Sequence, residues 1–164
     1  MTAWAPTPIS KGKVSITDFD LSYDTLHGPV EAVTGVSLVV NPGEFISIIG
    51  PSGCGKSTLL NAAAGFLKPT RGEVSVDGER VEGPSAERGM VFQQYSLFPW
   101  KTVRENVEFG LKMRGMPRSQ RERAARTLLG LAGLEAFEKH YPEKLSGGMK
   151  QRVGIVRALA TGPK

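Results

Sequence analysis

Cysteine is almost absent from this sequence, since Cys54 is the only one among 164 residues. A single cysteine excludes an internal disulfide and a zinc site built from several cysteines, so a reducing cytoplasm fits the chain. No run approaches the roughly 18 apolar residues of a membrane span. Residues 1–13 hold Trp4, Pro6 and Pro8 but no apolar segment typical of a secretory signal. We therefore expect residues 1–13 to form a flexible N-terminal lead.

Aromatic residues are missing from the most basic part of the chain. The formal net charge is +5, from 21 Lys and Arg against 16 Asp and Glu, and the excess gathers in one stretch diluted only by Glu122. Its basic residues are Lys112, Arg114, Arg118, Arg121, Arg123 and Arg126. Without interleaved aromatics, base stacking is poorly supported and we expect no nucleic-acid partner. The stretch predicts either a solvated helix face or a surface that meets a partner or a membrane.

A glycine-rich loop is the most informative feature that is present. It reads Gly-Pro-Ser-Gly-Cys-Gly-Lys-Ser-Thr and fits G-x-x-x-x-G-K-[ST], a loop whose backbone N–H groups wrap phosphates. Glycine permits positive φ and a close approach to the anion. Lys56 is expected to reach the β- and γ-phosphates, and the Ser57 hydroxyl to join a magnesium shell. The expected phosphate-binding residues are Gly50, Pro51, Ser52, Gly53, Cys54, Gly55, Lys56, Ser57 and Thr58.

The flanks of this loop have the order that a phosphate site requires. Residues 45–49 are a short apolar run that predicts a strand buried on both faces. Residues 58–64 favour a helix, and Gly65 is a suitable terminator. Strand, loop and helix in this order place the anion at a helix N-terminus. The alternative, a glycine-rich turn without a ligand, explains the loop but not its flanks.

Further strands are predicted on both sides of this motif. Residues 14–21 alternate apolar and polar side chains, residues 36–40 form a second strand, and residues 72–82 form a third that returns through an Asp-Gly turn. Together they predict an antiparallel patch. Residues 89–92 predict another buried strand that delivers Gln93 at its carboxyl end, where open α/β sheets place ligand contacts.

The second half of the chain has helical signals. Thr102 and Glu105 have the spacing of a capping box, and so do Ser119 and Glu122. A last helix is predicted over residues 148–160. These signals indicate a helical subdomain after Gln93.

The last helix is preceded by the sequence Leu-Ser-Gly-Gly-Met over residues 145–149. Ser146 occupies an N-cap position, and Gly147 and Gly148 offer N–H groups at a helix start, which is an anion site. Most such sequences are simple caps. Their combination with the phosphate loop and Gln93 is far more specific.

With these motifs on one chain, residues 14–164 resemble the ATP-binding subunits of ATP-binding cassette (ABC) transporters. The resemblance implies that residues 50–57 are the Walker A motif, that Gln93 is the Q-loop glutamine that contacts Mg²⁺ and senses the membrane subunit, and that residues 145–149 are the family signature. It also places Tyr23 where the family has an aromatic residue that stacks on adenine. The implied cofactors are ATP and Mg²⁺, with Ser57 and Gln93 toward the metal. Outside the loop, the implied nucleotide contacts are Tyr23, Gln93, Ser146, Gly147 and Gly148.

The fold implied is an α/β P-loop NTPase (ABC ATPase) core with an antiparallel β patch and a helical subdomain, incomplete at the C-terminus. Its parts would be a β and P-loop core over residues 14–92, the Q-loop and helical subdomain over 93–145, and the signature helix over 146–164.

Met149 departs from the family signature, which usually ends in glutamine. Phosphate contacts come from the serine hydroxyl and glycine N–H groups, so nucleotide binding is expected to survive, while a polar contact from position 149 is lost. The LSGGM form, together with residues 89–100, resembles importer ATPases of the nitrate, sulfonate and taurine group.

This resemblance implies partners and a location. The partners are a second ATP-binding subunit in a head-to-tail dimer, transmembrane permease subunits and a solute-binding protein, at the cytoplasmic face of the cell membrane. The interval between Gln93 and Ser146 is too short for the coiled coils or zinc modules of DNA-repair members. The alternatives are a non-transport ABC ATPase acting on nucleic acid or ribosomes, and a module that binds ATP without hydrolysing it.

The family's Walker B aspartate, catalytic glutamate and switch histidine have no counterpart among these 164 residues, and neither His27 nor His140 matches the switch position. We therefore expect no catalytic residue in this chain. The full-length protein is expected to be an ATPase, of which this sequence is an inactive part.

Overall fold

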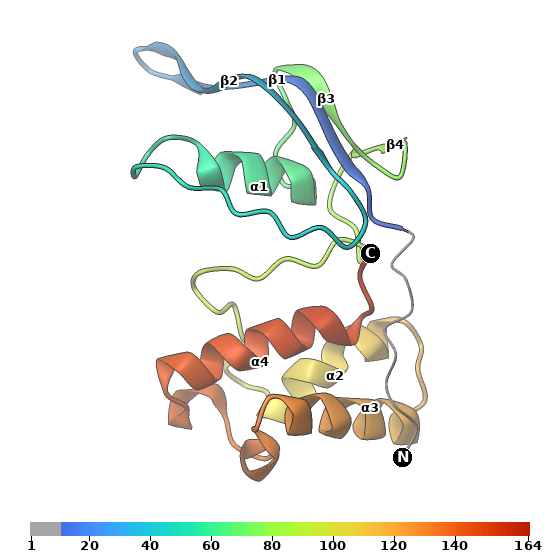
Figure 1. Cartoon of the computed structure of the whole chain (residues 1–164). Coiled ribbons are helices and arrows are strands. Elements are labelled where there is room, and N and C mark those ends of the chain that lie inside the picture. Colours follow the sequence, from blue (N-terminus) through green and yellow to red (C-terminus); the bar gives the residue numbers. More distant parts are fainter. Residues whose placement is uncertain (1–10) are drawn as a thin grey trace. The chain divides into compact units, whose positions relative to one another are not determined.

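The computed structural model describes residues 11–164 (Figure 1). The chain divides into two compact units, one comprising Met1–Ser85 with Lys164 and the other Ala86–Pro163. The flexible lead predicted for residues 1–13 falls mostly on residues 1–10, which lie outside the described residues. Across residues 11–164, no helix is long and apolar enough to cross a membrane.

The first unit is built on a four-stranded antiparallel sheet with the order β2-β1-β3-β4. The strands are β1 Val14–Thr25, β2 Gly28–Val40, β3 Arg71–Val76 and β4 Glu79–Arg80. The predicted antiparallel patch is thus confirmed. β2 begins well before residue 36, because pairing with β1 extends a segment whose own pattern is weak.

A bulge in β1 lets three apolar side chains reach one core. Side chains alternate along a strand, so Ile16 and Phe19 would ordinarily point to opposite faces. The register against β2 shifts between these two residues, where Asp18 has a φ of 45°. With one extra residue accommodated there, Ile16, Phe19 and Leu21 are all buried.

Helix α1, Lys56–Ala64, packs against this sheet and ends at Gly65, which has a φ of 88°. The predicted helix and its glycine terminator are confirmed. Leu59 and Ala62 of α1 are buried in the same cluster as the sheet's core residues. This packing fixes the position of the loop that leads into α1.

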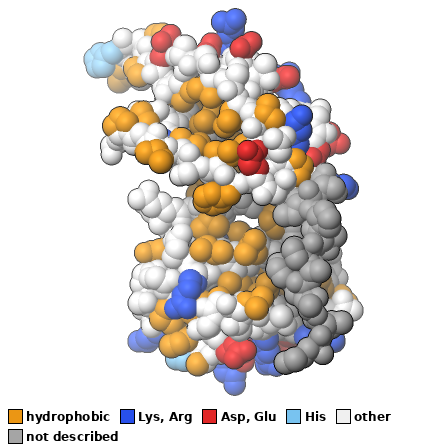
Figure 2. Space-filling view, in the orientation of Figure 1, with side chains coloured by type: hydrophobic (Ala, Val, Ile, Leu, Met, Phe, Trp, Pro, Cys, Tyr) orange, Lys and Arg blue, Asp and Glu red, His pale blue; other side chains and the backbone are white. Residues whose placement is uncertain are grey.

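Residues 45–49 do not form the predicted buried strand. Phe45 is 92% exposed and Ile49 90%, and no described strand pairs with the segment. A buried parallel strand needs hydrogen-bonded neighbours on both edges, which an apolar run cannot supply by itself. Ile46 and Ile48 instead line an apolar cavity of about 490 Å³ with residues of β1, β2 and α1. Figure 2 shows hydrophobic side chains gathered on the surface of this unit.

The second unit is helical, with α2 Val103–Met113, α3 Arg118–Leu131 and α4 Gly147–Ala160, and short 3₁₀ turns at Glu135–Phe137 and Pro142–Lys144. The helices enclose their own apolar cluster, which includes Val107, Leu129 and Val153. The predicted last helix and helical subdomain are confirmed.

The two predicted capping boxes have different outcomes. Thr102 and Glu105 form theirs at the start of α2. The backbone N–H of Thr102 donates to the Glu105 carboxylate and lowers the pKa of that carboxyl. The box predicted at Ser119 is wrong, because α3 begins after Pro117. Glu122 is bound by Arg118 at 2.8 Å instead.

Residues 89–92 do not form the second predicted buried strand either. Val91 and Phe92 are partly exposed, and the segment belongs to none of the described strands. The physical reason is the same as for residues 45–49, since strand pairing is supplied by other parts of a sheet. Gln93 therefore follows irregular backbone.

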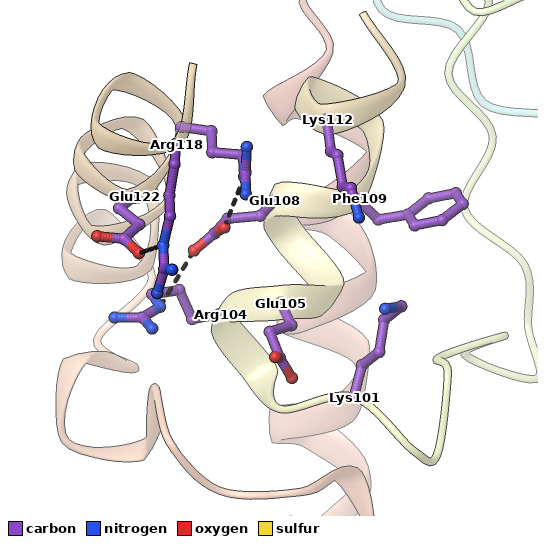
Figure 3. Close-up of a pocket in the computed structure, with 9 residues that line it drawn as sticks. Lys101, Arg104, Glu105, Glu108, Phe109, Lys112, Arg118 and Glu122 are labelled. Carbon is purple, nitrogen blue, oxygen red and sulfur yellow. Dashed lines mark hydrogen bonds and ion pairs between the residues drawn. The ribbon is translucent and has the colours of Figure 1, made fainter. Parts of the chain in front are cut away.

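Ion pairs neutralise much of the basic stretch. Glu108 of α2 forms an ion pair with Arg104 Nε at 3.1 Å. It also accepts a hydrogen bond from Arg121 Nε of α3 at 3.0 Å. Figure 3 shows this carboxylate and the Arg118–Glu122 pair among side chains that line a cavity of about 270 Å³. The prediction left open a solvated face or a partner surface. In the structure, part of the stretch joins α2 to α3.

Asn106 connects α2 to the segment that precedes it. It is fully buried, with 0% of its surface exposed. Its Oδ1 accepts the N–H of Phe98 at 2.8 Å. Its Nδ2 lies within hydrogen-bond distance of the carbonyl oxygens of Phe98 and Lys101, at 3.2 and 3.1 Å. Residues 98–101 are thereby fixed to the helix.

Replacing Asn106 with alanine is expected to lower the free energy of unfolding by about 2–3 kcal/mol, because part-buried backbone groups of Phe98 lose their partner. Chemical denaturation measures the change. The control is Gln120→Ala on the exposed surface of α3, expected to stay within about 0.5 kcal/mol of the parent. Equal midpoints for the two variants would contradict the role of Asn106.

Candidate nucleotide-binding site

The glycine-rich loop has the backbone geometry predicted for it. Gly53 and Gly55 have φ values of 84° and 87°, in the left-handed region where side chains are disfavoured. Gly55 also caps the start of α1. A Cβ on Gly55 would lie 2.5 Å from Cγ2 of Val33 and 2.7 Å from the carbonyl oxygen of Ala32. Glycine is therefore required at position 55 for two reasons, namely its positive φ and its close contact with β2.

Lys56 places its ammonium group inside the curve of the loop. Nζ donates to the carbonyl oxygens of Gly50 and Pro51 at 2.9 and 2.5 Å, and lies 3.5 Å from Cys54 Sγ. The charge thus sits beside the N-terminus of α1, where the helix dipole is also positive. Both features favour an anion at this point.

Tyr23 comes to the same helix from the far end of β1. Its hydroxyl lies 3.4 Å from Thr58 Oγ1, and 43% of the residue is exposed. Ser57, next to Thr58, is exposed in the first turn of α1. The first unit therefore brings Tyr23 together with the phosphate loop, while stacking on adenine stays a prediction.

Gln93 and the signature residues belong to the second unit. Gln93 is exposed in a turn followed by Tyr95 and Ser96, two consecutive residues with positive φ, at 39° and 47°. Sequence reasoning missed these two conformations, because neither tyrosine nor serine signals them. The roles of Gln93 and of the signature residues in binding Mg²⁺ and nucleotide remain predictions.

The signature helix begins as the sequence predicts. Ser146 is the N-cap of α4, and its Oγ accepts the N–H of Met149 at 3.4 Å. Gly147 and Gly148 are exposed in the first turn, where backbone N–H groups lack partners within the helix. Met149 packs its side chain against the apolar cluster of this unit. The helix start therefore has the capping geometry that the sequence predicts, anion binding there stays a prediction, and position 149 contributes packing.

The residues described could hold a nucleotide more readily than a bare metal ion. No group of three or more His, Cys, Asp or Glu side chains in residues 11–164 could hold a metal. The loop, with its two left-handed glycines and Lys56, fits a phosphate chain. A magnesium ion at Ser57 would depend on phosphate oxygens for most of its ligands.

A family model described as ABC transporter matches residues 33–164, most of the chain. The chain belongs to the ABC transporter family. Its similarity to importer ATPases is also confirmed. The nitrate import ATP-binding protein NrtD of Synechocystis sp. is 51% identical over 151 residues, covering 92% of this ABC chain and 57% of that protein. The taurine import ATP-binding protein TauB of Roseobacter denitrificans is 48% identical, covering 92% and 56%.

Solved structures agree with the family. The dimeric post-hydrolysis state of the ATP-binding cassette MJ0796, bound to ADP and Pi, is 39% identical with a TM-score of 0.84. The match covers 92% of this ABC chain and 70% of that one. The predicted fold class, an ABC ATPase core of the P-loop type, is confirmed. The chain spans little more than half the length of the curated relatives it matches.

Two glycine substitutions distinguish the need for a positive φ in the loop from the need for close contact with β2. Gly53→Ala meets no atom within 4 Å, so it is expected to cost only the left-handed conformation, about 1–2 kcal/mol in the free energy of unfolding. Gly55→Ala adds the clash with Val33 and Ala32 and is expected to cost about 1–3 kcal/mol more. Equilibrium denaturation followed by circular dichroism compares them. Equal losses would show that contact with β2 does not constrain the loop.

Proposed function

We propose that this ABC-family chain binds MgATP as part of the energy-coupling subunit of an importer. One observation carries the proposal, namely the loop of left-handed glycines that holds the Lys56 ammonium at the N-terminus of α1. Lys56 is already surrounded by loop carbonyls, so it is positioned to bind β- and γ-phosphates without ordering a mobile side chain. The loop N–H groups supply the remaining contacts.

The other site residues have distinct roles in this proposal. The hydroxyl of Ser57 and the side chain of Gln93 would contact Mg²⁺, which when bound neutralises phosphate charge. Tyr23 would stack on adenine, and its exposed ring next to α1 supports that role.

Ser146, Gly147 and Gly148 would bind the γ-phosphate held by a second copy or a related subunit. The exposed first turn of α4 supports this, because its N–H groups are available to an external anion. A dimer is also the form named for the MJ0796 cassette structures. In the head-to-tail arrangement, each chain would complete the other's nucleotide site.

The importer assignment rests on the relatives. Nitrate and taurine are the solutes named for NrtD and TauB, so a small solute such as nitrate, a sulfonate or taurine is the proposed cargo. Transmembrane permease subunits and a solute-binding protein would be the partners, at the cytoplasmic face of the membrane. Residues 98–126 are the proposed docking surface, and Trp100 within them is 71% exposed.

Hydrolysis is proposed for the complete protein and not for these 164 residues alone. The matched motifs supply phosphate and magnesium contacts, but none of them supplies a carboxylate that could act as general base for the attacking water. Binding of ATP and its turnover are therefore separable in experiments on this sequence.

Lys56→Ala is expected to weaken MgATP binding at least about tenfold, because a charge-assisted contact to the phosphates is removed. Isothermal titration calorimetry on the 164-residue chain measures this. The matched control is Lys68→Ala, which removes an exposed lysine of the same unit outside the loop. Unchanged affinity in Lys56→Ala would make the phosphate-loop assignment wrong.

Production of the protein at the full length of its reading frame, with a tagged copy in its own cells, tests the transport assignment. We expect co-purification with a multi-span membrane subunit, and ATP-dependent solute uptake that Lys56→Ala abolishes. A soluble complex with nucleic acid or ribosomes would favour the non-transport alternative. Tight ATP binding without hydrolysis in any assembly would favour a binding-only module.

A further inference from the structure

The backbone directly after Gln93 is held in an unfavourable conformation. Tyr95 and Ser96 both have positive φ, and neither is a residue type that tolerates it well. Asp18 and Asp77 are the other described non-glycine residues with positive φ. Asp18 lies in the bulge of β1, and Asp77 lies in the hairpin turn between β3 and β4. Such conformations persist when surrounding contacts enforce them and tend to occur in segments that switch.

One contact that enforces this conformation comes from Arg157, in the last turn of α4. Its Nη1 donates to the carbonyl oxygen of Ser96 at 2.7 Å. Its guanidinium carbon lies over the Phe98 ring, 5.6 Å from the ring centre, so the cation also contacts an aromatic face. Arg157 is partly buried, and this burial lowers the pKa of its guanidinium group.

The beginning of the same helix contacts the same segment. A Cβ on Gly147 would lie 3.0 Å from the hydroxyl oxygen of Tyr95, and one on Gly154 would lie 3.6 Å from its carbonyl oxygen. Gly147 is part of the signature motif. Helix α4 therefore contacts residues 95–98 at its signature end, at its middle and, through Arg157, at its other end.

We propose that Arg157 is a positioning residue that couples residues 95–98 to the signature residues Ser146–Gly148. A helix moves as a rigid element, so a displacement of Ser96 is passed through Arg157 to the start of α4, some 10 residues away. The inference rests on the proposed function, in which Gln93 responds to the membrane subunits and Ser146–Gly148 meet ATP. The inference adds Arg157 as the residue that links these two sites within the second unit.

The first test compares two arginines of α4. Arg157→Gln removes the contact with Ser96, whereas the control Arg152→Gln removes a donor to the Ala132 carbonyl, 2.6 Å away on another face. In the full-length protein assembled with its membrane subunits, Arg157→Gln is expected to lower the stimulation of ATP hydrolysis by those subunits about fivefold. The KM for ATP should stay within about twofold, since Arg157 is not one of the proposed nucleotide contacts. Full stimulation in Arg157→Gln, or an equal loss in Arg152→Gln, would overturn the proposal.

The second test needs no membrane subunit. Hydrogen exchange of the full-length protein by mass spectrometry should show faster exchange in Arg157→Gln at both residues 95–98 and residues 147–150, with neither change in Arg152→Gln. Faster exchange at residues 95–98 alone would reduce Arg157 to a local structural contact and overturn the coupling. If the parent protein shows no stimulation by membrane subunits, the proposed function fails, and the exchange result still decides the inference.

Arg157→Lys covers the case in which Arg157→Gln does not fold. Lysine keeps a donor for Ser96 but not the broad guanidinium group that lies over Phe98, so both readouts should change in the same direction and by less. No change in either readout for this variant would overturn the proposal.

Discussion

The contact between Gly55 and β2 is the constraint on which the nucleotide site depends. Because the loop backbone lies directly on Ala32 and Val33, its left-handed turn can close only in one place, and α1 must start there. The start of α1 in turn places the Lys56 ammonium, and its packing buries Leu59 and Ala62 under the sheet. The site and the core of the first unit are thus fixed by the same few atoms.

Local signals in the sequence predicted the parts of the structure that depend on nearby residues. The loop, the glycine end of α1, the capping box at Thr102 and the start of α4 each need only a few adjacent positions. The failures at residues 45–49 and 89–92 have the opposite cause, since a buried strand exists through partners distant in sequence. Asn106 and Arg157 were missed for a related reason. Each side chain bonds to backbone carbonyls of another segment. Because every residue type has the same carbonyl group, the sequence does not show which carbonyl is bound.

Met149 shows how the signature motif tolerates a changed side chain. The features that could bind an anion are the Ser146 hydroxyl and the N–H groups of the first turn, and these belong to the helix start whatever residue follows. At position 149, the side chain packs inward on the apolar cluster while its N–H serves the cap. Methionine at position 149 therefore contributes packing, and the N–H groups of the first turn do not depend on its side chain.

Arginine–glutamate pairs link the elements of the helical unit, and they differ in how far water reaches them. Glu108 pairs with Arg104 and with Arg121 of α3, and Glu138 pairs with Arg126 at 3.0 Å. The Glu108 side chain is only 10% exposed, so the attraction that joins α2 to α3 acts largely out of contact with water. Salt screens exposed ion pairs, with a Debye length of about 8 Å at physiological ionic strength, and screens buried pairs much less. The Arg118 side chain, by contrast, is 77% exposed in its pair with Glu122. Rising salt would therefore weaken this exposed pair first, while the link between α2 and α3 through Glu108 persists.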